Sequence, residues 1–410
     1  MPGERADCFD KRRDRRTMAQ APALKIAYLC DQSPEDRHSY SGGNARLLAS
    51  LRDHVGDVTV LGSDWHAAQP ARQVIEALPD SLTIRARWRA HLALGPVIAR
   101  GVADELRRAR YDVVFCAYSF QSLHRLRLPY PMVTAYTSDA TPTVYKCSEV
   151  GEAFGSFLKV SRLIDPLILR AERQVFQATD LLLWPSEWLK RQADPLYGLD
   201  PDRSLVVPWG ANIADPGPPV APPRLEQGAP LELLVLGRDW FAKGGPVAFD
   251  TMKALRAAGH DARLTVIGCT PPDFHRTDHV TVHPHLDKSK PDERAIFDAC
   301  LRSAHFMVMA SVESYGFAFC EASAHGLPSL CLNVGGVPVR EGVNGHAVAP
   351  GGDTVAQFSD LIHGYLKDPA TYDALRATTR REYETRLNWA SWGERVRAEL
   401  ESARSRLAKP

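Results

Sequence analysis

The sequence contains no apolar run that approaches the roughly 18 residues needed to span a bilayer. Its first twenty residues hold six basic and four acidic residues, and they lack the apolar stretch of a secretory signal. We therefore interpret residues 1–21 as a disordered tail, with Met18 as an alternative start of the native chain. A cytoplasmic protein is expected.

The eight cysteines are scattered, and none forms a C-x-x-C pair. This spacing indicates neither a zinc ribbon nor a dithiol redox motif. Some of the cysteines, Cys30 and Cys320 among them, lie in apolar runs, which is typical of buried thiols in a reducing compartment. The formal net charge of +1 gives no reason to expect nucleic acid as a partner.

The length of 410 residues favours two domains. Short apolar runs alternate with segments of helical spacing, which predicts an α/β protein with doubly wound sheets. Strands are expected at 24–30, from 58, and at 111–117, 131–136, 181–185 and 205–208, and then at 231–237, 262–268, 281–282, 305–310 and 329–333. The predicted domains are 22–208 and 231–385, joined by a Pro/Gly-rich linker over 209–230. A charged amphipathic helix is expected within the last segment, 386–410.

Ligands of open α/β sheets bind beyond the carboxyl ends of the strands, so the strand-to-helix loops are the candidate sites. The first such loop, before the first expected helix, contains Gly42 and Gly43. Glycines let the backbone approach a ligand, although a merely flexible loop explains them equally well. No G-x-G-x-x-G follows the first strand, which counts against a dehydrogenase.

The second loop, GRDWFAKGG, follows the first strand of the second domain and starts at Gly237. Arg238 offers a fork of donors and Lys243 a mobile point charge, so the two can flank a diphosphate. The alternative is an ordinary solvated loop.

The third loop leads into an apolar helix that begins near Phe317 and contains Glu321. A buried carboxylate is costly unless it is paired, and a ligand with vicinal hydroxyls such as ribose would satisfy it. Glu313 precedes the helix, where it can accept hydrogen bonds from a sugar ring. The alternatives are a helix-dipole role for Glu313 and an internal ion pair with an arginine for Glu321.

These segments resemble the retaining GT-B glycosyltransferases of family four. The hallmark E-x7-E is Glu313-SYGFAFC-Glu321, followed by ASAHGLPSLCLNVGGVP. The family's other motifs are matched by GRDWFAKGG, SGGN and VVPWGAN. The resemblance covers residues 24 to about 400, and it implies two Rossmann-like domains that face a cleft, with a C-terminal helix that crosses back to the first domain.

The resemblance implies a role for each matching residue. Arg238 and Lys243 would bind the donor diphosphate and stabilise the leaving nucleotide, while Glu313 would contact the transferred sugar. The remaining donor-binding residues would be Gly42, Gly43, Gly237, Tyr315, Gly316, Phe317 and Glu321. Of these, Tyr315, Gly316 and Phe317 would act through their backbone amides at the start of the helix. In the family, cations and helix ends replace a divalent metal, so neither a metal nor a cofactor is expected.

The sequence departs from the family at one position. Many members carry a histidine after the fourth strand of the first domain, where this chain reads MVTAYTSDATPTVY. Tyr136, Ser138 or Asp139 could occupy that space near the acceptor or the sugar.

The expected partners are a nucleotide-sugar donor and an acceptor that the sequence does not identify. The arginine-rich segment 85–110 suits either a solvated helix face or contact with an anionic membrane. The alternative functions are a sugar-nucleotide epimerase of the same fold and a non-catalytic nucleotide-sugar-binding scaffold.

Overall fold

The structure, a computed structural model, describes residues 23–36, 39–62, 64–78, 80–153, 163–217, 224–226 and 228–408, without the side chains of residues 80–86 and 153. The predicted tail over 1–21 lies outside the described residues, as do residues 218–223 and 227 of the predicted linker.

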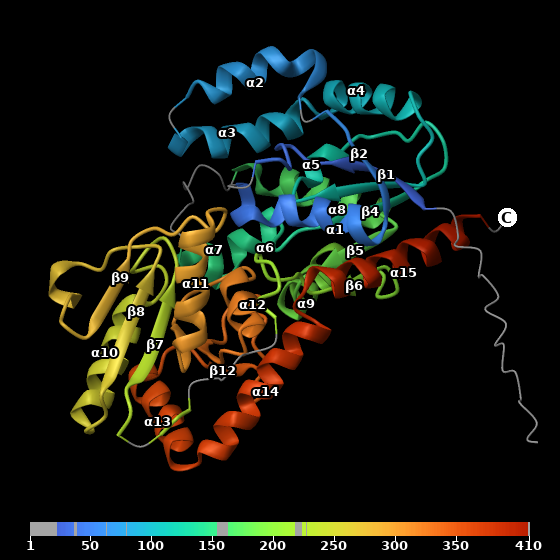
Figure 1. Ribbon diagram of the computed structural model, residues 1–410. Coiled ribbons are helices and arrows are strands. Elements are labelled where there is room, and N and C mark those ends of the chain that lie inside the picture. Colours follow the sequence, from blue (N-terminus) through green and yellow to red (C-terminus); the bar gives the residue numbers. More distant parts are fainter. Residues whose placement is uncertain are drawn as a thin grey trace, which may run out of the picture.

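The first domain is built on a six-stranded sheet of order β2-β1-β3-β4-β5-β6, in which neighbouring strands are parallel (Figure 1). Both faces of such a sheet are covered by helices, and β3, for example, is buried at each of its residues. The strands are β1 (Leu24–Leu29), β2 (Gly56–Val60), β3 (Val113–Ala117), β4 (Val133–Thr137), β5 (Leu181–Trp184) and β6 (Ser204–Val206).

The second domain repeats the plan with a six-stranded sheet of order β12-β11-β10-β7-β8-β9, again with parallel neighbours. Its strands are β7 (Leu231–Leu236), β8 (Ala262–Ile267), β9 (Val280–His283), β10 (Phe306–Met309), β11 (Ser329–Leu332) and β12 (Gly345–Val348). The prediction of two doubly wound sheets is therefore confirmed.

The helices of the first domain are α1 (Gly43–His54), α2 (Gln69–Glu76), α3 (Asp80–Ala93), α4 (Gly95–Arg107), α5 (Phe120–Leu123), α6 (Pro142–Cys147), α7 (Glu149–Ala153), α8 (Asp165–Ala178) and α9 (Glu187–Tyr197). Those after β7 are α10 (Gly245–Ala257), α11 (Pro291–Ser303), α12 (Phe317–Ala324), α13 (Thr354–Lys367), α14 (Pro369–Thr385) and α15 (Trp389–Leu407). Helix α14 is not predicted from the sequence, because its inward face includes Arg376, Arg380 and Glu382 and so lacks a plain apolar stripe.

The C-terminal helix α15 returns to the first domain, as the resemblance implied (Figure 1). The Ser50 hydroxyl of α1 donates a hydrogen bond of 2.6 Å to the carbonyl of Trp389. Further along α15, the ring of Trp392 meets Phe115 of β3 edge-on, and Arg404 lies 3.5 Å from Asp112. The C-terminal helix therefore packs on the first domain although it follows the second domain in the sequence.

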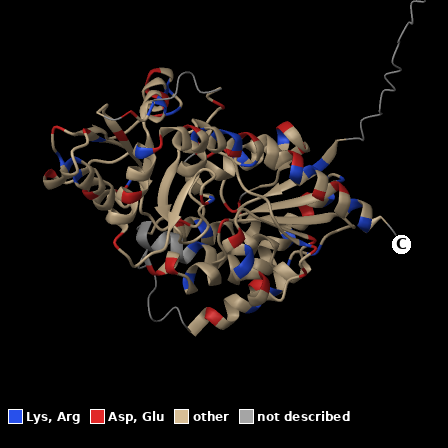
Figure 2. Ribbon diagram, turned by 90° about the horizontal axis from the view of Figure 1, so that it is seen from below, with Lys and Arg blue, Asp and Glu red and all other residues tan. Residues whose placement is uncertain are grey.

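Apolar packing is continuous from one domain to the other. One cluster of buried side chains includes Tyr28 and Leu47 of the first domain, Trp209 of the connecting segment, and Tyr315 and Phe319 of the second domain. Charged residues of both signs are interspersed along the ribbon (Figure 2). Within the described ranges, no helix combines the length and the apolar character needed to cross a membrane.

Candidate active site

The strand order reverses beside the first strand of each sheet: β1 lies between β2 and β3, and β7 lies between β8 and β10. Loops that leave two such neighbours diverge, and the crevice between them is the usual ligand site of an open α/β sheet. Gly42 and Gly43 follow β1, Arg238 and Lys243 follow β7, and Glu313 follows β10. The fold thus places the predicted residues at the two switch points.

Lys243 and Glu313 come together although 70 residues separate them in the sequence. Lys243 Nζ lies 2.5 Å from Glu313 Oε1, and both side chains are largely withdrawn from solvent, at 26% and 13% exposure. A β-carbon at Gly237 would lie 2.4 Å from Lys243 Cγ, so the missing side chain at Gly237 is what lets the lysine stem cross the loop. The site therefore holds an ammonium and a carboxylate side by side.

Arg238 lies at the other end of the same loop and is exposed. Its guanidinium shares no hydrogen bond or ion pair with the Lys243–Glu313 pair in the part of the chain that the structure describes. The loop is anchored between the two cations by Trp240, which is 3% exposed and donates through Nε1 to His275 Nδ1 at 3.0 Å. Arg238 can therefore move toward an anion while the loop stays fixed.

Helix α12 begins at Phe317 after Gly316, which takes the left-handed conformation with φ 91°. Glu321, inside this helix, is 3% exposed. Its Oε1 accepts a hydrogen bond of 2.6 Å from Lys288 Nζ. The ion-pair alternative is thus realised, although with a lysine where the sequence suggested an arginine. Lys288 itself is 36% exposed and can be displaced toward solvent by a ligand.

Tyr315 and Phe317 join the second domain to the first through Trp209. The Tyr315 hydroxyl donates to the Trp209 carbonyl at 2.6 Å, and the Phe317 ring stacks on the Trp209 ring with centroids 5.7 Å apart. The side chain of Tyr315 is therefore buried in the joint, so a ligand could meet this residue only through its backbone amide.

The glycine loop of the first domain faces this joint. A β-carbon at Gly43 would lie 2.3 Å from the Tyr118 hydroxyl and 2.9 Å from the Phe317 ring. Asn212, near Trp209, donates from Nδ2 to the Ser41 carbonyl at 2.9 Å, which holds the loop in place. Gly42 and Gly43 consequently lie against the start of α12, with no room for a larger residue at position 43.

Among the candidates to replace the family histidine, Asp139 reaches the second domain. Its Oδ2 accepts a hydrogen bond of 2.5 Å from the hydroxyl of Ser314, the neighbour of Glu313. Burial raises the pKa of the Asp139 carboxyl above its usual value. Tyr136 is fully buried, and the Ser138 hydroxyl donates to the carbonyl of Ala140 at 2.7 Å. Of these three residues, Asp139 is the one that contacts the E-x7-E segment within the part of the chain that the structure describes.

A polar cluster at the carboxyl end of β1 was not identified from the sequence. Asp31 is 3% exposed, and it accepts hydrogen bonds from the Tyr40 hydroxyl at 3.1 Å and from Gln121 Nε2 at 3.2 Å. Arg87 of α3 lies 3.9 Å away, so at least this arginine of the basic segment points inward. The sequence did contain one indication of this cluster, since Asp31 directly follows the buried strand expected at 24–30.

Several residues next to this cluster have a strained backbone conformation. Tyr40, Ser41 and Tyr118 all have positive φ, at 52°, 54° and 62°. The Tyr118 hydroxyl is buried without a hydrogen-bond partner among the described residues. Strain and an unsatisfied hydroxyl of this kind are common where a protein is built to meet a ligand.

Glu172 of α8 fixes the start of α6, the helix that follows Asp139. It accepts a hydrogen bond of 3.0 Å from the Thr143 amide and a second one from the Thr143 hydroxyl. Burial nevertheless raises the pKa of Glu172 to about 7.

This raised pKa predicts a pH dependence of stability. Because the folded state keeps the proton to higher pH than the unfolded chain, the free energy of unfolding should fall as pH rises from 4.5 to about 7. Glu172→Gln removes this titration, and it should stabilise the protein at pH 8 by on the order of 2 kcal/mol in urea unfolding. An exposed acid on α15 provides the control, Glu394→Gln. An identical pH profile for Glu172→Gln and wild type would contradict the assignment.

Two family models match the chain in succession. Residues 44–215 match "Glycosyltransferase Family 4", and residues 230–368 match "Glycosyl transferases group 1". The D-inositol 3-phosphate glycosyltransferase of Corynebacterium glutamicum (strain R) is 30% identical over 213 residues, which are 46% of this chain and 51% of that protein. The Corynebacterium efficiens enzyme of the same name is 29% identical over 298 residues, 64% of this chain and 66% of that protein. The chain spans about half the length of the first of these curated relatives.

Solved structures share the fold along nearly the whole chain. Sucrose-phosphate synthase from Thermosynechococcus elongatus superposes with a TM-score of 0.58 at 18% identity, covering 94% of this chain and 100% of that one. HepE from Anabaena, solved with UDP and glucose, gives a TM-score of 0.55 at 14% identity and covers 92% of this chain and 100% of that one. The expected GT-B architecture is confirmed.

Proposed function

This chain belongs to the group 1 glycosyltransferases, and from that premise we propose that it transfers a sugar from a nucleotide-sugar to an acceptor hydroxyl. The observation that carries the proposal is the contact of 2.5 Å between Lys243 and Glu313 at the switch point of the second domain. In a nucleotide-sugar the diphosphate adjoins the transferred sugar, so a cation beside a hydroxyl-binding carboxylate matches the part of the donor that reacts.

In the proposed mechanism, Lys243 and Arg238 bind the diphosphate from two sides. Lys243 uses one ammonium hydrogen for Glu313 and keeps two for phosphate oxygens. As the bond between the sugar and the diphosphate breaks, negative charge grows on the leaving phosphate, and the two cations stabilise it more strongly than in the ground state. The start of α12 adds backbone amides and its positive helix end.

Glu313 is proposed to accept hydrogen bonds from hydroxyls of the transferred sugar, and Glu321 from those of the ribose. The acceptor is proposed to enter from the first domain, beside Asp139 and the Gly42–Gly43 loop. The arrangement supports leaving-group stabilisation without a covalent nucleophile, and we propose retention of the anomeric configuration on the family resemblance alone.

The candidate acceptors are a small phosphorylated polyol, a lipid and a polysaccharide. The curated relatives are named for D-inositol 3-phosphate, which makes that compound the first acceptor to assay. We further propose a cytoplasmic enzyme that needs no cofactor, with any membrane contact made peripherally by the arginine-rich segment.

A panel of UDP-, GDP- and ADP-sugars identifies the donor. Specific thermal stabilisation by one nucleotide-sugar is expected, with about 3 kcal/mol at a hundredfold excess over Kd. Release of nucleoside diphosphate when an acceptor is present distinguishes transfer from the alternatives. An epimerised donor without transfer would indicate the epimerase, and binding without any turnover would indicate the scaffold.

Donor chemistry should not depend on a divalent metal. Because Arg238, Lys243 and the α12 terminus provide the positive charge, excess EDTA is expected to leave the turnover rate unchanged well below the melting temperature. Strong inhibition that magnesium reverses would refute this part of the mechanism.

A further inference from the structure

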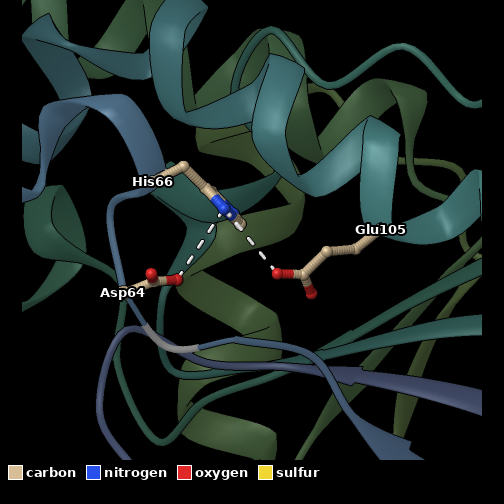
Figure 3. A group of neighbouring side chains, drawn as sticks. All are labelled: Asp64, His66 and Glu105. Carbon is tan, nitrogen blue, oxygen red and sulfur yellow. Dashed lines mark ion pairs between the residues drawn. The ribbon is translucent and has the colours of Figure 1, made fainter.

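Three metal-ligating side chains converge in the first domain, away from the donor site. Asp64 and His66 lie on the segment after β2, and Glu105 reaches them from α4 (Figure 3). His66 Nδ1 lies 3.7 Å from Asp64 Oδ1 and 3.7 Å from Glu105 Oε1, and the three atoms are within 4.8 Å of one another.

These separations are too long for hydrogen bonds, yet they suit a shared ion. If the third separation lies between 3.7 and 4.8 Å, a point in the plane of the three atoms and equidistant from them is roughly 2.1–2.4 Å from each. Bonds from zinc to imidazole nitrogen or to carboxylate oxygen measure about 2.0–2.2 Å. The gap therefore has the size of a coordinated metal ion.

The surroundings hold the three side chains in this geometry. The Gly62 amide donates to Glu105 Oε2 at 2.9 Å, which leaves Oε1 turned toward His66. A β-carbon at Gly101 would lie 2.2 Å from the His66 ring, so the ring lies directly on α4. His66 Nε2 is buried and has no hydrogen-bond partner in the described ranges. Neither ring nitrogen of His66 is thus hydrogen-bonded there, although two carboxylates flank the ring.

We propose that Asp64, His66 and Glu105 bind a divalent transition metal, with Zn²⁺ the ion that fits this donor set. Neutral imidazole and two carboxylates provide three ligands and two negative charges, and water would complete the coordination shell. The bound ion joins the segment after β2 to α4. It acts on the stability of the first domain, because β2 is the edge strand of the first sheet, whereas the Arg238–Lys243 loop and Glu313 follow β7 and β10 in the second sheet.

Metal binding at this site should weaken as pH drops, because metal ligands must be deprotonated to bind an ion.

The test uses the full chain after treatment with chelator and dialysis. Titration calorimetry with ZnCl₂ at pH 7.5 is expected to show one site per chain, and the loaded protein should melt at higher temperature than the stripped protein. Glu105→Gln and Asp64→Asn preserve side-chain shape and should each weaken this site at least tenfold. Mn²⁺ and Mg²⁺ are titrated in parallel, and weaker binding is expected for the harder Mg²⁺.

A second histidine pair provides the control for adventitious binding. His260 and His363 have ring centroids 5.1 Å apart, so His260→Gln removes a competing zinc ligand while leaving the proposed site intact. The proposal is overturned if the full chain binds no stoichiometric Zn²⁺, or if binding survives in Glu105→Gln and Asp64→Asn but disappears in His260→Gln. These measurements involve no donor, so their failure leaves the proposed glycosyl transfer untouched.

Discussion

Lys243→Ala is expected to reduce kcat/KM for the donor by about 100- to 1000-fold, and Arg238→Ala should have an effect of similar size. Each substitution removes a cation that interacts more strongly with the leaving diphosphate than with the intact donor. Release of nucleoside diphosphate from the donor identified by the panel is the measurement. The loss should lie mainly in kcat once the donor is saturating.

Loss of Lys243 also leaves the Glu313 carboxylate, 13% exposed, without its cation. Lys243→Gln therefore accompanies the alanine variant, because its amide can still donate to Glu313 while the charge is gone. The matched control is Lys253→Ala, which removes an exposed lysine on α10 that lies 3.7 Å from Asp250. Near-full activity of either Lys243 variant in a folded protein would show that Lys243 does not bind the diphosphate.

Glu321→Gln is expected to weaken binding of the nucleoside diphosphate by about 10- to 100-fold in titration calorimetry. A hydrogen bond to a charged acceptor contributes about 1.5–3 kcal/mol, and each 1.4 kcal/mol is a factor of ten in affinity. Glutamine keeps the volume of the side chain in a helix where Glu321 is 3% exposed, so packing is preserved. The affinity for a 2′,3′-dideoxy nucleotide, which lacks both hydroxyls, should fall much less on this substitution.

Lys288→Ala distinguishes the ribose role from a purely structural ion pair. Lys288 Nζ lies 2.6 Å from Glu321 Oε1. If Glu321 serves only that ion pair, Lys288→Ala and Glu321→Gln should both lower the melting temperature. Neither substitution should then change the affinity for the nucleotide. If Glu321 binds ribose, Lys288→Ala should retain most of the affinity that Glu321→Gln loses. Unchanged affinity in Glu321→Gln would contradict the ribose role.

The sheets were predictable because their strands are short apolar runs bounded by turn residues. The runs at 24–30 and 231–237 became β1 and β7 with little change at their ends. Helices were harder to predict where the inward face is polar, as in α14, which buries Arg380 and Glu382. The strand β12, with the sequence GHAV, is too short and too mixed to give a periodic signal.

The candidate site was predictable only as a set of loops. The position of Lys243 after β7 and of Glu313 after β10 follows from strand order, because adjacent parallel strands bring their carboxyl ends together. Their positions in the sequence do not show that the two side chains contact each other, because that contact depends on side-chain geometry. The same holds for contacts across the domains, such as Asp139 with Ser314 and Gly43 with Phe317.

The cluster around Asp31 shows why the polar groups of the first domain were harder to infer from the sequence. Its members come from separate elements, and Asp31, Arg87 and Gln121 become neighbours only in the folded domain. No local motif joins them. The Asp64–His66–Glu105 group has the same origin, since Glu105 lies on a helix far along the chain from its partners.

The central claim is that the loop from Arg238 to Lys243 binds the diphosphate of the donor. Its most direct test compares the affinities of the nucleoside and its diphosphate by titration calorimetry, in wild type and in the Arg238→Ala/Lys243→Ala double variant. We predict that wild type binds the diphosphate at least 100-fold more tightly than the nucleoside, and that the double variant loses most of this difference while binding the nucleoside as before. A double variant that keeps the full preference for the diphosphate would contradict the account.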